Sequence, residues 1–425
     1  MDKNTIIGFV LIAALLIGFS WYTQPSEEDI AKQHMQDSIT ALAKKKAEES
    51  RNAEAQASNQ NAQNNVNADT TAVFYKSLSG KAQNIILKNS KLELTLSTKG
   101  GTVEKAVIKD FKDNKGNKDL TLFDSKDQSL KFMLEGKETN IITSDLYFTP
   151  SNITDSTVTM TAVGSNGRSL VMNYKLGKNY LLHFSLKANG MSGLFSPNYN
   201  KLDIEWTDHC RQQEKGFTFE NRYASLTYHF TDGGTDYISE TSEKVDEKIE
   251  DAIDWVAFKN QFFSAVMIAK DDLGTNSLMT SIPQEKGSGY LKQYGAKVKT
   301  SFDPTGNNST ELEFYYGPND FRLLQKIEKE STFNKDLELH RLVYLGWPLF
   351  RIINRWFTLY VFDWLTGLNI NMGIVLILIT LLLKVITYPL VKKSYMSSAK
   401  MRVLKPKLEE ATKQYNKPED QMQKQ

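Results

Sequence analysis

A lysine interrupts an otherwise apolar run near the end of the chain. The run Gly373–Val391 consists mainly of Leu, Ile and Val, and Lys384 lies inside it. As an α-helix, a run of this length extends over about 28 Å, close to the hydrocarbon thickness of a bilayer. Because a charged side chain inside a membrane usually faces a partner or a water-filled cavity, Lys384 indicates a functional site within a membrane-spanning helix.

Three polar side chains accompany Lys384 at helical spacing. Thr380, Thr387 and Tyr388 recur with it every three or four residues, which places all four on one helix face. Lys384 lies about 10 Å from the end of the run, farther than a lysine stem comfortably reaches. We interpret this face as the lining of a hydrated substrate groove. The alternatives are that Lys384 snorkels to the interface or forms a structural ion pair.

Other residues that could support catalysis show no suitable arrangement. The five His residues are scattered, and none forms a pair at metal-ligand spacing. Cys210 adjoins His209 without the arrangement of a thiol nucleophile, and the glycine pair in "STKGGTVE" is typical of a hairpin or bulge. We therefore predict no metal, no cofactor and no enzymatic activity.

The length and composition of the chain limit its domain organisation and its partners. With 425 residues the protein has room for more than one domain, and its single cysteine excludes an internal disulfide. A negative mean hydropathy confines membrane contact to short segments. The formal net charge of +2 points to no nucleic acid, and we expect no DNA partner.

Basic flanks predict the topology. An apolar segment, Thr5–Tyr22, lacks a cleavage pattern and indicates a retained anchor over residues 1–25, with its amino end cytoplasmic; a cleaved signal is the alternative. The second run is followed only by basic charges before Glu409, which predicts a cytoplasmic location for Lys392, Lys393, Lys400, Arg402, Lys405 and Lys407. We expect a multi-pass inner-membrane protein whose large middle part is periplasmic.

The middle of the chain contains two segments of different composition. Residues 26–71 include a tract rich in Ala, Asn and Gln that cannot form a core, and we expect a flexible tether. Residues 72–340 contain short alternating runs such as "KLELTLS" and "SLVMNYKL", separated by turn residues. The predicted fold class is mixed: a large antiparallel β-sandwich plus α-helical membrane segments.

An amphipathic helix is predicted at 346–367, before the core span at 371–391. Its polar stripe contains Arg351 and Arg355, and its aromatic surface includes Trp347 and Trp356. This pattern is typical of a helix that lies in the membrane interface, and a core helix of the β domain is the alternative. Residues 392–425 read as a basic helical segment in which Pro406 begins a new helix. Its charges could contact anionic lipid, nascent chain or ribosome.

The order of these parts resembles the YidC/Oxa/Alb family of membrane protein insertases, in the long form with a periplasmic domain. The segment "ITLLLKVITYPLVKKSYMSSAKMRVLKPKLEE" carries most of the resemblance, with weaker support from "FYYGPND" and "LGWPLFRIINRWF". The resemblance implies a supersandwich akin to sugar mutarotases but without enzymatic activity. It also implies a five-span core around a groove open to cytoplasm and lipid, and 392–425 as the start of a cytoplasmic helical hairpin. An arginine usually occupies the position of Lys384.

The same resemblance implies a function and partners. The function is to aid insertion, folding and assembly of membrane proteins, alone or with the Sec translocon, and the substrates are nascent membrane proteins. Two alternatives stay open: a membrane-tethered periplasmic protein that binds or modifies carbohydrate, and a passive scaffold for translocon partners. We also expect the natural protein to continue beyond Gln425.

Overall fold

The computed structural model describes residues 73–116, 118–238, 244–346 and 348–413. The predicted anchor at 1–25, the tether at 26–71 and Trp347 lie outside the described residues. A small unit contains residues 73–79 and Gly164–Asn166, with the 3-10 turn η1 (Tyr75–Ser77) and a bond from the Ser165 amide to the Val73 carbonyl. All other described residues belong to a second unit, to which the rest of this description refers.

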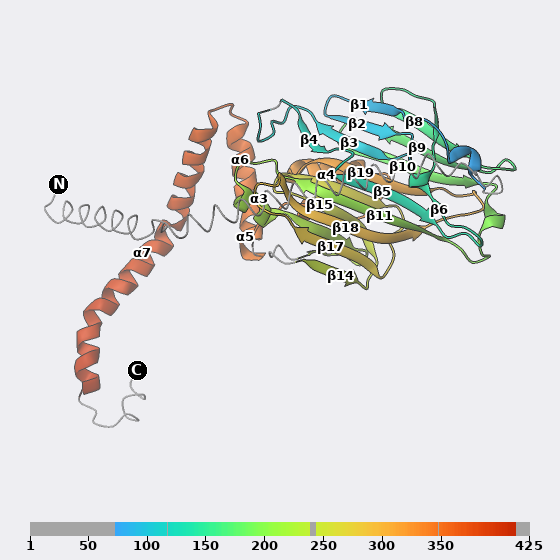
Figure 1. The fold of residues 1–425 in the computed structure, drawn as a ribbon. Coiled ribbons are helices and arrows are strands. Elements are labelled where there is room, and N and C mark those ends of the chain that lie inside the picture. Colours follow the sequence, from blue (N-terminus) through green and yellow to red (C-terminus); the bar gives the residue numbers. More distant parts are fainter. Residues whose placement is uncertain (1–72, 117, 239–243, 347, 414–425) are drawn as a thin grey trace, which may run out of the picture. The chain divides into compact units, whose positions relative to one another are not determined.

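Antiparallel sheets make up most of the second unit (Figure 1). Four strands form one sheet, in the order β1 (Asn84–Lys88), β2 (Leu92–Ser97), β3 (Val103–Ile108) and β4 (Leu120–Phe123). Six strands form the next, in the order β14 (Val245–Ile249), β17 (Ser277–Pro283), β18 (Tyr290–Ser301), β11 (Lys201–Arg211), β5 (Gln128–Leu134) and β6 (Ile141–Ile142). Nine strands form the largest, in the order β13 (Thr235–Tyr237), β12 (Ser225–Phe230), β15 (Ile253–Lys259), β16 (Phe263–Ala269), β19 (Thr310–Pro318), β10 (Leu181–Asn189), β9 (Ser169–Leu176), β8 (Thr157–Val163) and β7 (Thr149–Ser151).

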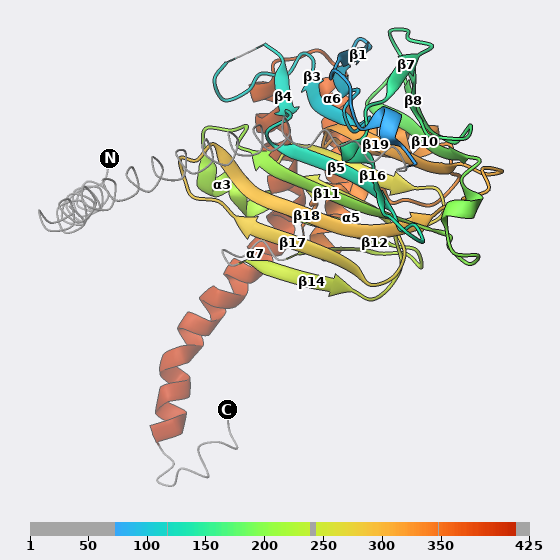
Figure 2. The same ribbon diagram turned by 45° about the vertical axis from the view of Figure 1, so that its right-hand side comes forward.

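The six-stranded and nine-stranded sheets pack face to face, as both views show (Figures 1 and 2). Along β11 buried residues alternate with partly exposed ones, as expected for a strand with one face in a core. Trp206 on β11 stacks on Phe258 of β15 with ring centroids 4.0 Å apart, and Phe132 on β5 stacks on Phe184 of β10 at 5.2 Å. The predicted antiparallel β-sandwich is confirmed.

Helices occupy the connections and the C-terminal part of the chain. Within the sandwich region these are α3 (Phe217–Tyr223), α4 (Phe321–Glu330) and the 3-10 turns η2 (Thr143–Asp145), η3 (Ser192–Leu194) and η4 (Leu339–Leu342). After the sandwich come α5 (Pro348–Ile353), the π-helical turn η5 (Asn354–Thr358), α6 (Leu359–Thr366) and α7 (Met372–Lys413).

Two central strands of the nine-stranded sheet are buried on both faces. Every residue of β15 and β16 is buried, so they lack the alternation seen in β11. The segment Ser331–Gly346, called the connector here, leads from α4 to α5 and bonds to outward-facing side chains of this sheet. Trp255 donates from Nε1 to the Leu337 carbonyl at 2.7 Å, and Lys259 donates from Nζ to the Leu342 carbonyl at 3.2 Å.

Carboxylates complete the attachment of the connector. Asp254 forms an ion pair with Lys335 at 2.6 Å, and Glu313 accepts a bond from the Thr332 amide at 3.0 Å. Burial favours the neutral form of Asp254, but its contact with His229 at 3.5 Å and its bond from Lys335 outweigh this effect and lower the pKa of that carboxyl group. The pKa of Glu313 is likewise lowered despite burial, by hydrogen bonds from His183 and Thr332. Both carboxylates are therefore ionised at neutral pH and serve as acceptors for the connector.

We expect Lys335→Met to destabilise the sandwich, because the Asp254 side chain is only 6% exposed and would keep a buried charge without its cation. Breaking a buried pair in this way costs about 3 kcal/mol of unfolding free energy. The matched control is Lys326→Met, whose partner Glu330 lies 3.9 Å away at an exposed site, with an expected cost below about 1 kcal/mol. Thermal unfolding of the whole chain in detergent gives both values. Equal losses in the two variants would contradict this assignment.

The same pair predicts a pH dependence. Because the folded-state pKa of Asp254 is lowered, its contribution to stability is present above the unfolded pKa, about 4, and is lost as the pH falls through the folded value. Unfolding of the wild type should therefore become easier below about pH 4. The pH dependence of Lys335→Met should be weaker in that window.

The single cysteine should be unreactive in the folded protein. Cys210 is 6% exposed. Burial raises the pKa of its thiol, with further raising by Asp208 and Glu220, so the reactive thiolate is suppressed. A water-soluble maleimide should label Cys210 only after denaturation, and should label Ser125→Cys, at an exposed position, in the native state. Rapid native labelling of Cys210 would show that the strand β11 opens.

Candidate functional site

The helix α7 carries the predicted groove residues. Within the described ranges it is the one helix that is long and apolar enough to cross a membrane, over Met372–Pro406. Both Pro389 and Pro406 lie inside it, and Figure 1 shows it as a single curved helix. The expectation that Pro406 begins a new helix is therefore wrong. A proline removes only one intrahelical bond and its ring clash is relieved by bending, so a helix can continue through it.

Most apolar side chains of α7 have no protein cover among the described residues. Leu381, Val385 and Leu390 are 57%, 62% and 71% exposed, whereas Val375 is fully buried where α7 begins. Exposed apolar area costs about 25 cal/mol per Å² in water. This surface therefore requires lipid or other apolar protein surfaces around it.

The unbroken helix brings Thr380, Lys384, Thr387 and Tyr388 onto one face, as their spacing indicates. Thr380 donates from Oγ1 to the Leu376 carbonyl and Thr387 donates to the Leu383 carbonyl, both at 2.8 Å. These hydroxyl protons are satisfied within the helix, and the oxygens remain available as acceptors. Among the described residues, no carboxylate lies within ion-pair distance of Lys384. The ammonium group is therefore available to a partner.

The polar face extends further than the apolar run. Lys384 and Arg402 are five helical turns apart, so they share one face, and Tyr395 and Ser398 lie close to the same line. The sequence analysis missed this continuation because it ended the helical face at Val391. The other basic residues are exposed and spread around the helix; they are Lys392, Lys393, Lys400 and Lys405, while the side chain of Lys407 lies outside the described part.

The segment Pro348–Thr366 is helical throughout, with the π-helical turn in its middle. Asn354 donates from Nδ2 to the Leu345 carbonyl at 3.0 Å, which ties this turn to the end of the connector. Trp356 is 67% exposed, and the Arg355 guanidinium lies 6.0 Å from its ring centroid. Arg351 and Arg355 are both exposed and stand one turn apart.

The helix α6 is fastened to the sandwich by one side chain of α4. Arg322 binds the Asp363 carboxylate at 3.0 and 3.1 Å and lies 4.9 Å from the ring centroid of Tyr360. A guanidinium can make both contacts at once because it is planar and donates in a fixed fork. The helical segment Pro348–Thr366 and the sandwich are thus joined at α4 as well as through the connector.

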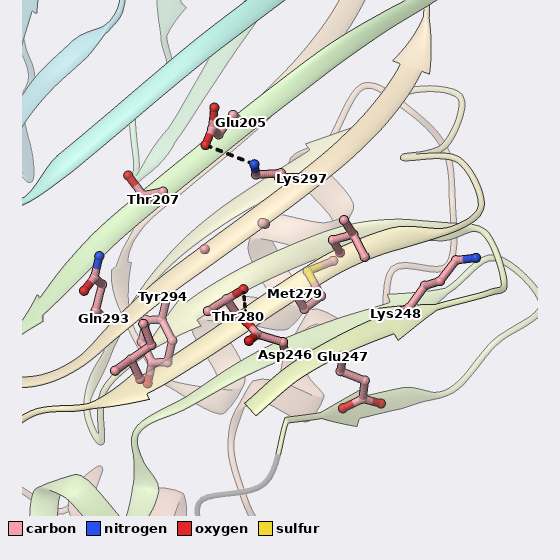
Figure 3. A pocket seen from close by; sticks show the side chains of 14 residues that line it. Glu205, Thr207, Asp246, Glu247, Lys248, Met279, Thr280, Gln293, Tyr294 and Lys297 are labelled. Carbon is pink, nitrogen blue, oxygen red and sulfur yellow. Dashed lines mark hydrogen bonds and ion pairs between the residues drawn. The ribbon is translucent and has the colours of Figure 1, made fainter. Parts of the chain in front are cut away.

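A groove on the outer face of the six-stranded sheet tests the carbohydrate alternative. It has a volume of about 430 Å³, and Gly295 between Thr207 and Thr280 leaves its floor open. Figure 3 shows its carboxylates: Glu205 on β11, paired to Lys297 at 3.6 Å, and Asp246 and Glu247 side by side on β14, with Asp246 bonded to Thr280 at 2.8 Å. They do not converge on one point, as acid and base groups for sugar chemistry would.

A histidine and a carboxylate do meet on the nine-stranded sheet. His183 Nδ1 lies 3.0 Å from Glu313 Oε1, beside a polar groove of about 400 Å³. The Glu313 side chain is fully buried, and the same oxygen also accepts bonds from the Thr332 amide and hydroxyl. Its role is therefore to hold the connector. Within the described ranges, no group of three or more His, Cys, Asp or Glu residues could hold a metal ion.

Two protein families match this chain. Residues 84–360 match the family described as YidC periplasmic domain, and residues 364–425 match the 60Kd inner membrane protein family. Membrane protein insertase YidC of Phocaeicola vulgatus is 49% identical, and the match covers 100% of this chain and 68% of the relative. The proteins of the same name from Bacteroides fragilis and Parabacteroides distasonis are 44% and 36% identical, and the chain spans 68% and 67% of their lengths.

Solved structures give more distant matches. A galactose mutarotase-like protein from Lactobacillus casei is 12% identical with a TM-score of 0.36, and the match covers 56% of this chain and 100% of that one. A putative aldose 1-epimerase from Escherichia coli is 8% identical with a TM-score of 0.34, at 56% and 100% coverage. Likenesses at this level carry no conclusion about a ligand.

Proposed function

Because this chain belongs to the YidC family of membrane protein insertases, we propose that the Lys384 face of α7 receives the polar tail of a membrane protein during insertion. The observation that supports this proposal is the unpaired charge of Lys384 among the described residues, on a polar face that runs from Thr380 to Arg402. The protein is an inner-membrane protein. Its substrates are nascent membrane proteins.

The proposed mechanism is electrostatic and hydrophobic. A hydrated positive groove part-way into the bilayer lowers the cost of moving a short polar tail through it. The apolar segment of the substrate then slides into lipid, and its burial drives the step. The threonine oxygens at 380 and 387 supply acceptors for water in such a groove. No covalent bond forms or breaks.

The electrostatic attraction between Lys384 and an acidic tail lies between two limits. Two unit charges 4 Å apart gain about 1 kcal/mol in bulk water and about 4 kcal/mol at an effective dielectric constant near 20, and a partly hydrated groove lies between these limits. Lysine offers a point charge without the planar fork of arginine, so it attracts a carboxylate without bidentate geometry. Lys384 thus favours acidic tails without binding them too tightly to release.

The proposed topology follows from the charges. The helices α5 and α6 lie along the outer interface, α7 crosses the membrane, and its basic C-terminal half enters the cytoplasm. There the exposed charges Lys392, Lys393, Lys400 and Lys405 meet anionic lipid, the nascent chain or the ribosome. The Sec translocon is the proposed partner for larger substrates.

Substitutions of Lys384 in the complete insertase should separate substrates by tail charge. Lys384→Arg should keep insertion, Lys384→Ala should slow acidic-tailed substrates, and Lys384→Glu should slow them most, by at least about fivefold from the lower limit of about 1 kcal/mol. Neutral-tailed substrates should change less, because burial of their apolar span still drives insertion. The assay is protease-protected insertion of substrate pairs that differ only in tail acidity.

The control is Lys393→Glu, which makes the same charge change on the opposite side of α7. It should leave the ratio between acidic and neutral tails near the wild-type value. If Lys384→Glu and wild type insert both tails with the same ratio, Lys384 has no electrostatic role in tail transfer.

Spin labels should distinguish an interfacial helix from a span. Labels at Ile352→Cys, Trp356→Cys and Tyr360→Cys should show similar membrane depths, because a helix in the interface plane keeps one depth along a face. A crossing helix would instead deepen by about 12 Å over these eight residues. Labels at Ile377→Cys, Leu381→Cys and Val385→Cys on α7 are the positive control and should show that gradient. A gradient in the first series would reverse the orientation of everything after it.

A further inference from the structure

A basic cavity lies where the connector and α5 meet the nine-stranded sheet. It has a volume of about 270 Å³, room for about nine waters at their liquid volume. Its basic lining residues come from distant parts of the sequence: Lys259, His340, Arg341, Arg351 and Arg355. Among the described lining residues there is no Asp or Glu.

The floor of the cavity is polar and buried. Ser225 and Thr227 of β12 are 1% and 4% exposed, and their hydroxyl oxygens lie 3.1 Å apart. The Thr235 Oγ1 atom is buried and has no hydrogen-bond partner among the described residues. Lys259 is 8% exposed and directs its amine to the connector carbonyl of Leu342. Buried hydroxyl groups beside the positive charge of Lys259 favour an oxygen-rich anion.

The rim of the cavity carries three arginines, and two of them have no ion-pair partner among the described residues. Arg341 is neutralised by Glu338 at 2.7 Å. For Arg351 and Arg355, by contrast, no carboxylate lies within ion-pair distance in the described part of the chain. Two guanidinium groups one helical turn apart, over a cavity whose described lining contains no carboxylate, suit a phosphate group, whose oxygens accept paired N–H bonds.

Exposed aromatic and apolar side chains surround the cavity. Tyr344 lines the cavity and is 58% exposed, and the neighbouring helical turns expose Ile352 at 59% and Trp356 at 67%. Exposed aromatic residues beside arginines are typical of the headgroup level of a bilayer. The charge of the cavity also disfavours headgroups that carry an ammonium group close to the phosphate.

We propose that this cavity binds the phosphate of an anionic phospholipid from the outer leaflet of the inner membrane. Arg351 and Arg355 hold the phosphate, the buried hydroxyls accept or donate to the headgroup, and the acyl chains lie along the exposed apolar side of α5 and η5. The proposal rests on the interfacial position of α5 and α6 in the proposed function. Such a lipid would link the sandwich, the connector and the interfacial helix.

The test is cross-linking at the rim. A benzophenone maleimide is attached at Tyr344→Cys in the complete protein, with Cys210 buried and unreactive, and the protein is reconstituted into phosphatidylcholine vesicles that contain phosphatidylglycerol. We expect cross-links to phosphatidylglycerol above its share of the lipid. Arg351→Gln with Arg355→Gln should lower this yield at least about tenfold at subsaturating lipid. Lys297→Gln with Lys299→Gln, which removes the same charge from the six-stranded sheet, should leave it unchanged.

The remaining outcomes overturn the proposal in distinct ways. Competition by inorganic phosphate, compared with chloride at equal ionic strength, would make the site one for free phosphate. Competition by an acidic peptide alone would make it a peptide site. An unchanged yield in the double arginine variant, with unfolding temperature like the wild type, would leave the cavity without a lipid role. If the depth labels on α5 and α6 show a span, the interfacial assignment itself fails, and that result is independent of the cross-linking yield.

Discussion

Buried polar groups on the outer face of the nine-stranded sheet must be hydrogen-bonded, and this constraint sets the course of the chain out of the sandwich. An unsatisfied buried donor or acceptor costs about 1–3 kcal/mol. Trp255, Lys259 and Glu313 each find a partner in the connector, and Glu328 of α4 accepts the amides of Leu337 and Glu338 at 3.1 Å. These groups of the sheet, the connector and α4 therefore satisfy one another.

The membrane-proximal helices depend on that attachment. The connector ends at Gly346, whose φ of 90° is accessible to glycine at little cost, and α5 begins two residues later. Asn354 then binds the last part of the connector, and Arg322 holds α6 against α4. Because the connector is held by buried bonds, Arg351 and Arg355 are placed beside Lys259, and a basic cavity forms between elements that are separate in the sequence.

Charged side chains of the protein differ in whether the described part of the chain supplies an ion-pair partner. Lys335 is half-buried and pairs with the buried Asp254, and their pairing makes them structural. Lys384 has no carboxylate partner among the described residues and lies among exposed apolar side chains on α7. A charge in an apolar environment is costly unless water or a partner compensates it. The same electrostatic rule thus explains a structural ion pair in the sandwich and, in the membrane helix, a charge that can bind a partner.

Local periodicity in the sequence determined the alternating strands, the apolar run with its Lys384 face and the aromatic helix with Arg351 and Arg355, because these patterns involve residues only a few positions apart. The prediction that Pro406 begins a new helix was wrong, since a proline that suits a first turn can also lie inside a helix when the turns on either side are helical. Only the tertiary structure decided which strands are buried on both faces, how the connector crosses them and that Lys259 lines a cavity with Arg351. Such contacts join positions some eighty or more residues apart, where no sequence period relates one residue to the other.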